Sequence, residues 1–108
     1  MGDKYGKLVR DKIPSVIARN GELAVVSTLS DAEYKKCLED KLYEECQEAI
    51  EATGEARIEE LADVVEVVDA LAKIEQKNLD DVLAVAEVKR HKRGSFDKRI
   101  FLETVIKK

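Results

Sequence analysis

Two short acidic clusters constrain the fold of this chain more than any other feature of its sequence. Glu45 and Glu48 stand three residues apart in one strongly helical segment, and Glu60 and Asp63 stand three apart in the next. Positions three apart share one face of a helix, so each pair can direct its oxygens to one point. Two packed helices would bring four carboxylates together, and their mutual repulsion then requires a neutralising cation. The pattern predicts a metal site between two helices.

Capping and turn residues predict further helices around this pair. A capping box over Ser30–Glu33 begins a helix over 31–53, and Gly54 separates it from a helix over 55–77. Because this turn is very short, the two helices should be antiparallel neighbours. A helix with Pro14 in its first turn should stop at Asn20-Gly21, and an extended connector or short edge strand should follow over 22–29. A further helix is expected over 80–92 and should stop near Gly94. The stretch over 96–106 fits either a helix or an extended tail. We predict an all-α antiparallel helix bundle with a short extended N-terminal connector.

Length and composition fit one domain, residues 1–108, whose core is small enough that dimerisation would help its stability. Hydrophobic residues make up 44% of the chain, which excludes disorder, and no apolar run approaches the length of a membrane span. No apolar signal region follows the charges of residues 1–5, so we expect a cytoplasmic protein. Cys37 and Cys46 would lie roughly 13 Å apart on one helix, too far for a disulfide.

Helical periodicity places Glu45 at a position that packing would normally give to leucine. Glu45 falls near the middle of the apolar stripe of the first long helix, and Glu48 falls at the edge of that stripe. Glu60 and Asp63 continue an apolar stripe of the second helix. The residues that form the first stripe are Leu38, Leu42, Cys46 and Ala49. The acids therefore divide into an inward set and a solvated set.

The plain alternative is that all four acids are the solvated glutamates of a highly charged helix pair. Charged residues make up 39% of the chain, and Lys41 and Arg57 could neutralise part of the charge. For any single glutamate this interpretation is the better one. For four acids at paired spacing on apolar faces, we favour the cation.

Ligation by carboxylate oxygens alone suits hard cations, Mg²⁺ first and Mn²⁺ second, whereas a di-iron bundle would need Glu-x-x-His pairs, which this chain lacks. Mg²⁺ can hold a polyphosphate and activate water, so the site predicts phosphoanhydride hydrolysis. Without a glycine-rich phosphate loop, basic side chains must recognise the phosphates. The candidate substrate-binding residues are Arg10, Lys12, Lys41, Lys89, Lys92 and Arg93.

Acids and bases are unevenly distributed along the chain. Residues 30–69 hold fourteen acids and four bases, whereas residues 86–108 hold eight bases and three acids. An acidic centre and a basic end suit a metal complex of a polyphosphate. The basic run over 89–93 fits equally well a helix C-terminus that complements the macrodipole.

These motifs resemble the MazG-type all-α nucleoside triphosphate pyrophosphohydrolases, a superfamily that includes phosphoribosyl-ATP pyrophosphohydrolase. The resemblance rests on Glu45-x-x-Glu48 and Glu60-x-x-Asp63, and on the flanking segments Leu8–Pro14 and Lys92–Phe96, which extend it over nearly the whole chain. The opening segment is most similar to small single-domain members described as phosphoribosyl-ATP pyrophosphohydrolase-like.

The resemblance implies cleavage between the α and β phosphates to give a nucleoside monophosphate and pyrophosphate. It implies that Glu45, Glu48, Glu60 and Asp63 hold Mg²⁺, and we assign the catalytic role to Glu45 and Glu48. It also implies a homodimer or homotetramer whose active sites draw on more than one chain.

Two other functions are compatible with the sequence. Residues 31–77 could form a non-enzymatic helical interaction module that oligomerises or binds a partner, and metal dependence would separate this hypothesis from the enzyme. Nucleic-acid binding through the basic tail is the weaker hypothesis, because the chain is acidic overall and has three Tyr, two Phe and no Trp, without an aromatic–basic pattern. The base and sugar of a nucleotide substrate stay open.

Overall fold

The computed structural model describes residues 6–108, and every regular element in that part of the chain is an α-helix. The helices are α1 (Ile13–Arg19), α2 (Asp31–Glu51), α3 (Gly54–Ile74) and α4 (Leu79–Arg93). The predicted all-α class is confirmed, and residues 22–29 form the expected extended connector. The prediction that no export signal begins at residues 1–5 falls on residues that lie outside the described part of the chain.

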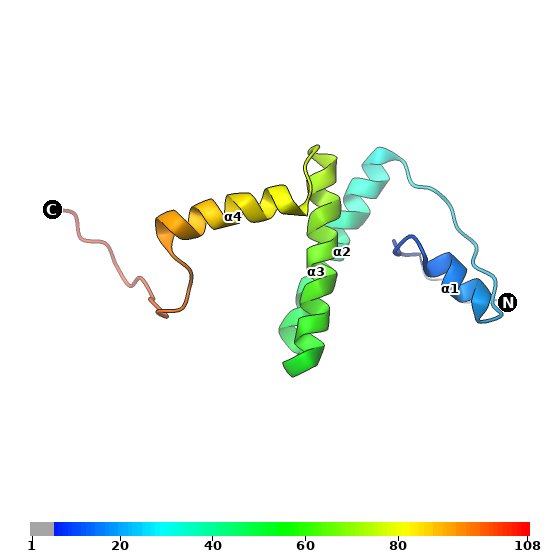
Figure 1. Cartoon of the computed structure of the whole chain (residues 1–108), viewed down its shortest axis with the longest axis horizontal. Helices are drawn as coiled ribbons and strands as arrows, with labels where there is room; N and C mark the ends of the chain where they lie inside the picture. Colours follow the sequence, from blue (N-terminus) through cyan, green and yellow to red (C-terminus); the bar gives the residue numbers. More distant parts are fainter. Residues whose placement is uncertain (1–5) are drawn as a thin grey trace.

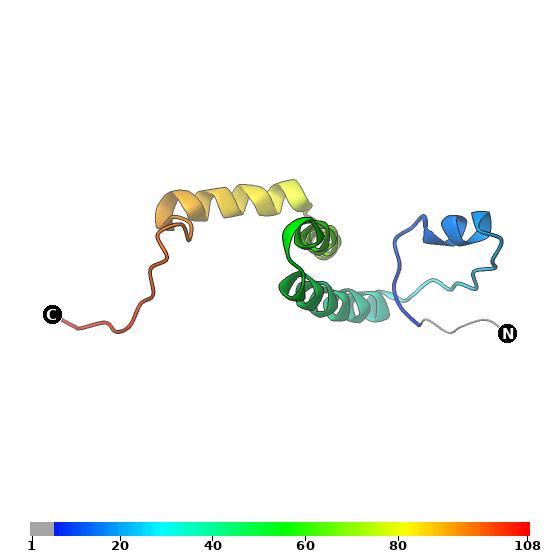
Figure 2. The same cartoon turned by 90° about the horizontal axis from the view of Figure 1, so that it is seen from below.

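The two long helices α2 and α3 lie side by side and form the packed unit of the bundle (Figures 1 and 2). α2 begins with the predicted capping box, in which the Glu33 N–H donates to Ser30 Oγ at 3.3 Å and the Ser30 N–H donates to Glu33 Oε1 at 3.0 Å. This reciprocal pair satisfies two backbone donors that a helix start otherwise leaves open. The helix boundary and the hairpin therefore follow from local sequence.

The turn between α2 and α3 is held by Arg57. Its guanidinium donates to the backbone carbonyls of Ala49, Ile50 and Ala52 at 3.1, 3.2 and 2.8 Å. These carbonyls lie at the C-terminal end of α2, where no further turn of helix can donate to them. The predicted boundaries shift accordingly, since α2 ends at Glu51 and not at residue 53, and Gly54, with a φ of 60°, is the first residue of α3.

α3 ends three residues earlier than expected, at Ile74. Gln76 adopts a left-handed φ of 59°, and the Lys77 N–H donates back to the Ala72 carbonyl at 2.9 Å. This backward bond is the pattern by which many helices close their last turn. The chain is thereby turned out of the α3 axis before α4 begins.

α4 starts from a second capping box and then departs from the hairpin. Asn78 and Asp81 exchange backbone-to-side-chain hydrogen bonds, and the Leu79 N–H donates to Asp69 Oδ1 on α3 at 2.8 Å. Beyond this start α4 extends away from α2 and α3 (Figure 1). It ends at Arg93, and Gly94, whose φ is 82°, is its C-cap.

The core of the described chain is small and lies inside the hairpin. Leu38 and Ala49 of α2 and Val67 of α3 are its buried apolar residues, with 4%, 7% and 5% of their surface exposed. The radius of gyration is 18.8 Å, whereas a compact chain of this length has about 13 Å. A single copy thus leaves much of its apolar surface uncovered.

No helix within residues 6–108 is both long enough and apolar enough to span a lipid bilayer.

Candidate metal centre

Glu45 is the buried charged residue of the described chain, with 7% of its surface exposed. It lies on the face of α2 that packs against α3, as its place in the apolar stripe predicted. Its Oε1 lies 3.5 Å from Lys41 Nζ, one helical turn earlier. Its Oε2 is buried and has no hydrogen-bond partner among the described residues. A carboxylate oxygen in this state is costly unless a proton or a cation reaches it.

α3 places two further carboxylates opposite Glu45. One oxygen each from Glu45, Glu60 and Asp63 lie within 4.8 Å of one another. Glu60 Oε2 is also buried without a hydrogen-bond partner in the described chain. The spacing of Glu60 and Asp63 along α3 therefore puts both on the side that faces α2, and three of the four predicted ligands converge.

Glu48, the fourth predicted ligand, is exposed and lies outside this group of three. It borders the group nonetheless, because a hydrogen bond with the Glu60 carboxyl is the largest cause that raises the pKa of Glu48, followed by desolvation. Glu48 thus lies at the rim of the cluster.

The electrostatics of the cluster disfavour negative charge. Desolvation is the largest cause that raises the pKa of Glu45, and the negative charges of Glu48 and Asp63 raise it further. The positive charge of Lys41 opposes these effects and lowers that pKa. The net shift is upward, so one lysine does not compensate for the burial and the neighbouring acids.

Arg10 reaches the same cluster from the N-terminal segment. Its Nη2 donates to Asp63 Oδ1 at 2.6 Å, and its Nη1 lies 3.9 Å from Glu66 Oε2. The predicted substrate-binding residues Arg10 and Lys41 are therefore both at the carboxylates. The sequence contained Arg10 as a phosphate-binding candidate, but its direct pairing with Asp63 joins residues 53 positions apart and has no local signal.

The other predicted phosphate-binding residues lie elsewhere. Lys12 is exposed at the N-cap of α1. Lys89, Lys92 and Arg93 are exposed on the outer part of α4, which points away from the hairpin in a single copy (Figure 1). Arg57, considered as a neutralising base, holds the α2–α3 turn instead.

The donor set fits a hard divalent cation. All three converging groups are carboxylates, and two of them carry a buried oxygen without a partner. Hard cations such as Mg²⁺ prefer oxygen ligands and stabilise closely spaced carboxylates. The acids therefore have the composition, the convergence and the unmet charge that such an ion requires.

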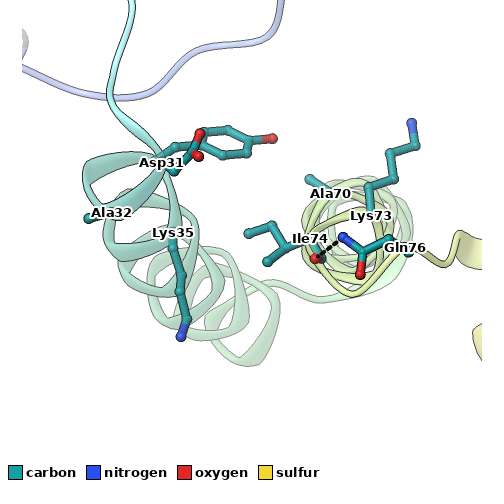
Figure 3. Close-up of a pocket in the computed structure, with 8 residues that line it drawn as sticks. Asp31, Ala32, Lys35, Ala70, Lys73, Ile74 and Gln76 are labelled. Atoms are coloured by element: carbon teal, nitrogen blue, oxygen red, sulfur yellow. Dashed lines mark hydrogen bonds between the residues drawn. The ribbon is translucent and has the colours of Figure 1, made fainter.

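A groove of about 570 Å³ opens at the other end of the hairpin (Figure 3). Asp31, Tyr34 and Lys35 of α2 line one side, and Ala70, Ile74 and Gln76 lie on or beside α3. Tyr34 precedes Glu45 by eleven residues, which is about 16 Å along a helix. The groove is thus separate from the carboxylates.

Comparison with known proteins assigns no family to the chain. No protein-family model matches it, and no solved structure matches it. A segment of 42 residues is 50% identical to an uncharacterized protein of Mycolicibacterium smegmatis. The match spans 39% of this chain and 43% of that relative, so the chain covers less than half of the relative's length.

Proposed function

We propose that this protein is a Mg²⁺-dependent nucleotide pyrophosphohydrolase that converts a nucleoside triphosphate, or a related nucleotide, and water into a nucleoside monophosphate and pyrophosphate. Mn²⁺ is the second choice of metal. The observation that carries the proposal is the buried, unpartnered Oε2 of Glu45, which faces Glu60 and Asp63 between two packed helices. A solvated surface cluster would not remove this oxygen from water, so the arrangement supports a binding site over chance clustering.

In this proposal Glu45, Glu60 and Asp63 hold the metal, with Glu48 at the rim. When bound, Mg²⁺ would supply Lewis acidity toward phosphate oxygens and lower the pKa of water. The chain itself supplies proton transfer and positioning. Glu48 is exposed beside Glu60, so it can accept the proton of the attacking water from the open side of the site.

Arg10 and Lys41 are the proposed phosphate-binding residues of the same chain. Each now pairs with one of the carboxylates, Arg10 with Asp63 and Lys41 with Glu45. A cation that neutralises these acids would free the guanidinium and the ammonium for phosphate oxygens. Lys89, Lys92 and Arg93 would have to come from a second copy, which is consistent with a homodimer or homotetramer.

A pyrophosphate-release assay tests the proposal. Purified protein is incubated with Mg²⁺ and a panel of nucleoside triphosphates, and inorganic pyrophosphatase converts any pyrophosphate into phosphate for colorimetric detection. We expect release with the wild type, no release with Glu45→Gln, and wild-type release with Glu44→Gln. Glu44 is the matched control because it is the exposed neighbour of Glu45. Equal activity of the wild type and Glu45→Gln would overturn the proposal.

A helical interaction module is the second candidate function, and exposed apolar side chains favour it. Tyr43 and Ile50 of α2 and Ile58 of α3 are 81%, 69% and 60% exposed. Such side chains on a hairpin could bind another protein without any metal. If Mg²⁺ and nucleotide leave the thermal midpoint unchanged, this module becomes the better assignment, because a ligand that binds only the folded state must raise stability.

A further inference from the structure

We infer that residues 100–106 of one copy pair as a β-strand with residues 22–29 of a second copy, and that the second copy returns the same pairing. The inference deepens the homo-oligomer part of the proposed function by naming the segments that join the copies. It does not depend on the hydrolase activity.

The C-terminal tail is extended and strongly apolar after a turn over 96–99, in which the Arg99 N–H donates to the Phe96 carbonyl at 3.1 Å. Ile100, Phe101 and Leu102 are 82%, 85% and 73% exposed, and Val105 and Ile106 are 78% and 84% exposed. Branched and aromatic residues of this kind favour strands over other structures. A stretch of such side chains in water is unfavourable, because its apolar area stays in contact with solvent.

The connector over 22–29 has the same character. It is extended, and its side chains Leu23, Val25 and Val26 are 89%, 92% and 65% exposed. Neither segment is paired as a strand within residues 6–108. An extended segment with open backbone donors and acceptors is a template for pairing with another strand.

The charges that flank the two segments are opposite in sign. Lys98, Arg99, Lys107 and Lys108 flank the apolar run of the tail, against Glu103 within it. The connector begins at Glu22 and runs into the acidic first turn of α2, which holds Asp31 and Glu33. Opposite charges on facing strands stabilise a pair, and like charges oppose one.

The two segments cannot meet within one copy of this structure. They lie at opposite ends of the molecule, whose longest extent is 68 Å (Figure 1). Two copies placed side by side and head to tail would bring each tail to the connector of the other. A two-fold axis closes this arrangement, as in other exchanges of an identical element between protomers.

The surface area shows how much a second copy could cover. The chain exposes 10207 Å², about 4,000 Å² more than the roughly 6,000 Å² of a compact chain of this mass. Permanent homodimers bury about 2,000–5,000 Å² in total. The excess is therefore large enough for an interface of this class.

Cysteine cross-linking between differently tagged copies tests the pairing. Cys37 and Cys46 are first replaced by alanine, and helical circular dichroism checks that the protein still folds. A copy with Val25→Cys is mixed with copies that carry one cysteine at each position from 100 to 106, and Ser95→Cys serves as the control. Paired strands bring opposite Cα atoms to about 4.5–5.5 Å, which a disulfide can span.

We expect covalent dimers of unlike copies whose yield alternates along the tail, because successive strand residues face opposite sides. The highest yield should exceed that of Ser95→Cys by about tenfold or more, since pairing raises the effective concentration. The inference would be overturned if the yields did not alternate along the tail. It would also be overturned if a single chain that carries both cysteines closed a disulfide within itself. Active protein without the cross-link would refute only the strand pairing, and cross-linked protein without activity would refute only the enzyme.

Discussion

The α2–α3 hairpin and the two chain ends differ in how they treat apolar surface. The hairpin contains the buried residues of the described chain, Leu38, Glu45, Ala49 and Val67. The connector and the tail contain the most exposed apolar residues, such as Val25 at 92% and Phe96 at 96%. The hairpin therefore packs its inner face and positions the carboxylates there, whereas its outer face, with Tyr43 at 81%, and the chain ends leave apolar surface uncovered.

Charge follows the same division. The hairpin carries most of the acids, and the outer part of α4 with the tail carries most of the basic excess. In one copy the two regions diverge, so the bases of α4 cannot neutralise the carboxylates (Figure 1). The converging carboxylates lie within one hairpin, and under the proposed function any phosphate contact from α4 would come from a second copy.

The largest effect is expected from a substitution in the hairpin core. Leu38→Ala removes a side chain that is 4% exposed, and we expect the free energy of unfolding to fall by about 2–5 kcal/mol. Val85→Ala on α4 is the contrasting change, since Val85 is 57% exposed in one copy. Urea titration at two protein concentrations measures both. An equal loss for the two variants at low concentration would contradict the division between hairpin and ends.

Loss of a ligand is the next largest effect. Glu60→Gln keeps the size of the side chain but removes a charge from the converging group, and we expect the rate of pyrophosphate release to fall by about 100-fold. Glu59→Gln is the matched control, because Glu59 is the exposed neighbour on α3. If the rate of pyrophosphate release fell by a similar factor in both variants, the overall negative charge of α3, and not this site, would support activity.

The α2–α3 turn should respond more moderately. Arg57→Ala removes three hydrogen bonds to the end of α2, and we expect the unfolding free energy to drop by about 1–2 kcal/mol. Arg57→Lys keeps the charge without the planar fork, so it should recover only part of the loss. If Arg57→Ala left the unfolding free energy unchanged in a denaturant titration, the turn would be held by the backbone alone.

The smallest effect is a pH dependence of the metal-free hairpin. Burial raises the pKa of Glu45 above its usual 4.5, so the folded state binds its proton more tightly than the unfolded state does. Stability should then fall as pH rises from 4.5 through the raised pKa, and stay lower above it. The thermal midpoints of Glu45→Gln and the wild type are measured over this pH range with EDTA present. The midpoint of Glu45→Gln should rise relative to that of the wild type as the pH rises. A constant difference would contradict the burial of this charge.

Much of the fold could be predicted because its signals are local. The capping box at Ser30 and Glu33 marks the start of α2, and Asn78 marked the approach to α4. Glu45 was assigned to the inner face because it lies in a stripe of apolar residues on its own helix. These inferences need only helical periodicity and cap chemistry, both of which act within a few residues.

What could not be predicted depends on contacts between distant segments. Arg57 was considered as a counter-charge, but its fork closes α2. Arg10 pairs with Asp63 only because the N-terminal segment returns to α3. The exposure of Glu48 depends on how the two helices cross, which one helix cannot specify. The direction of α4 likewise depends on the turn before Leu79.

Calorimetric titration of Mg²⁺ into the nucleotide-free protein tests the central claim most directly. We predict one saturable binding process in the wild type, weakened by about tenfold or more in Glu45→Gln and unchanged in Glu44→Gln. The same Mg²⁺ affinity in Glu45→Gln and the wild type, or no saturable binding in the wild type, would contradict the account of the converging carboxylates as a metal centre.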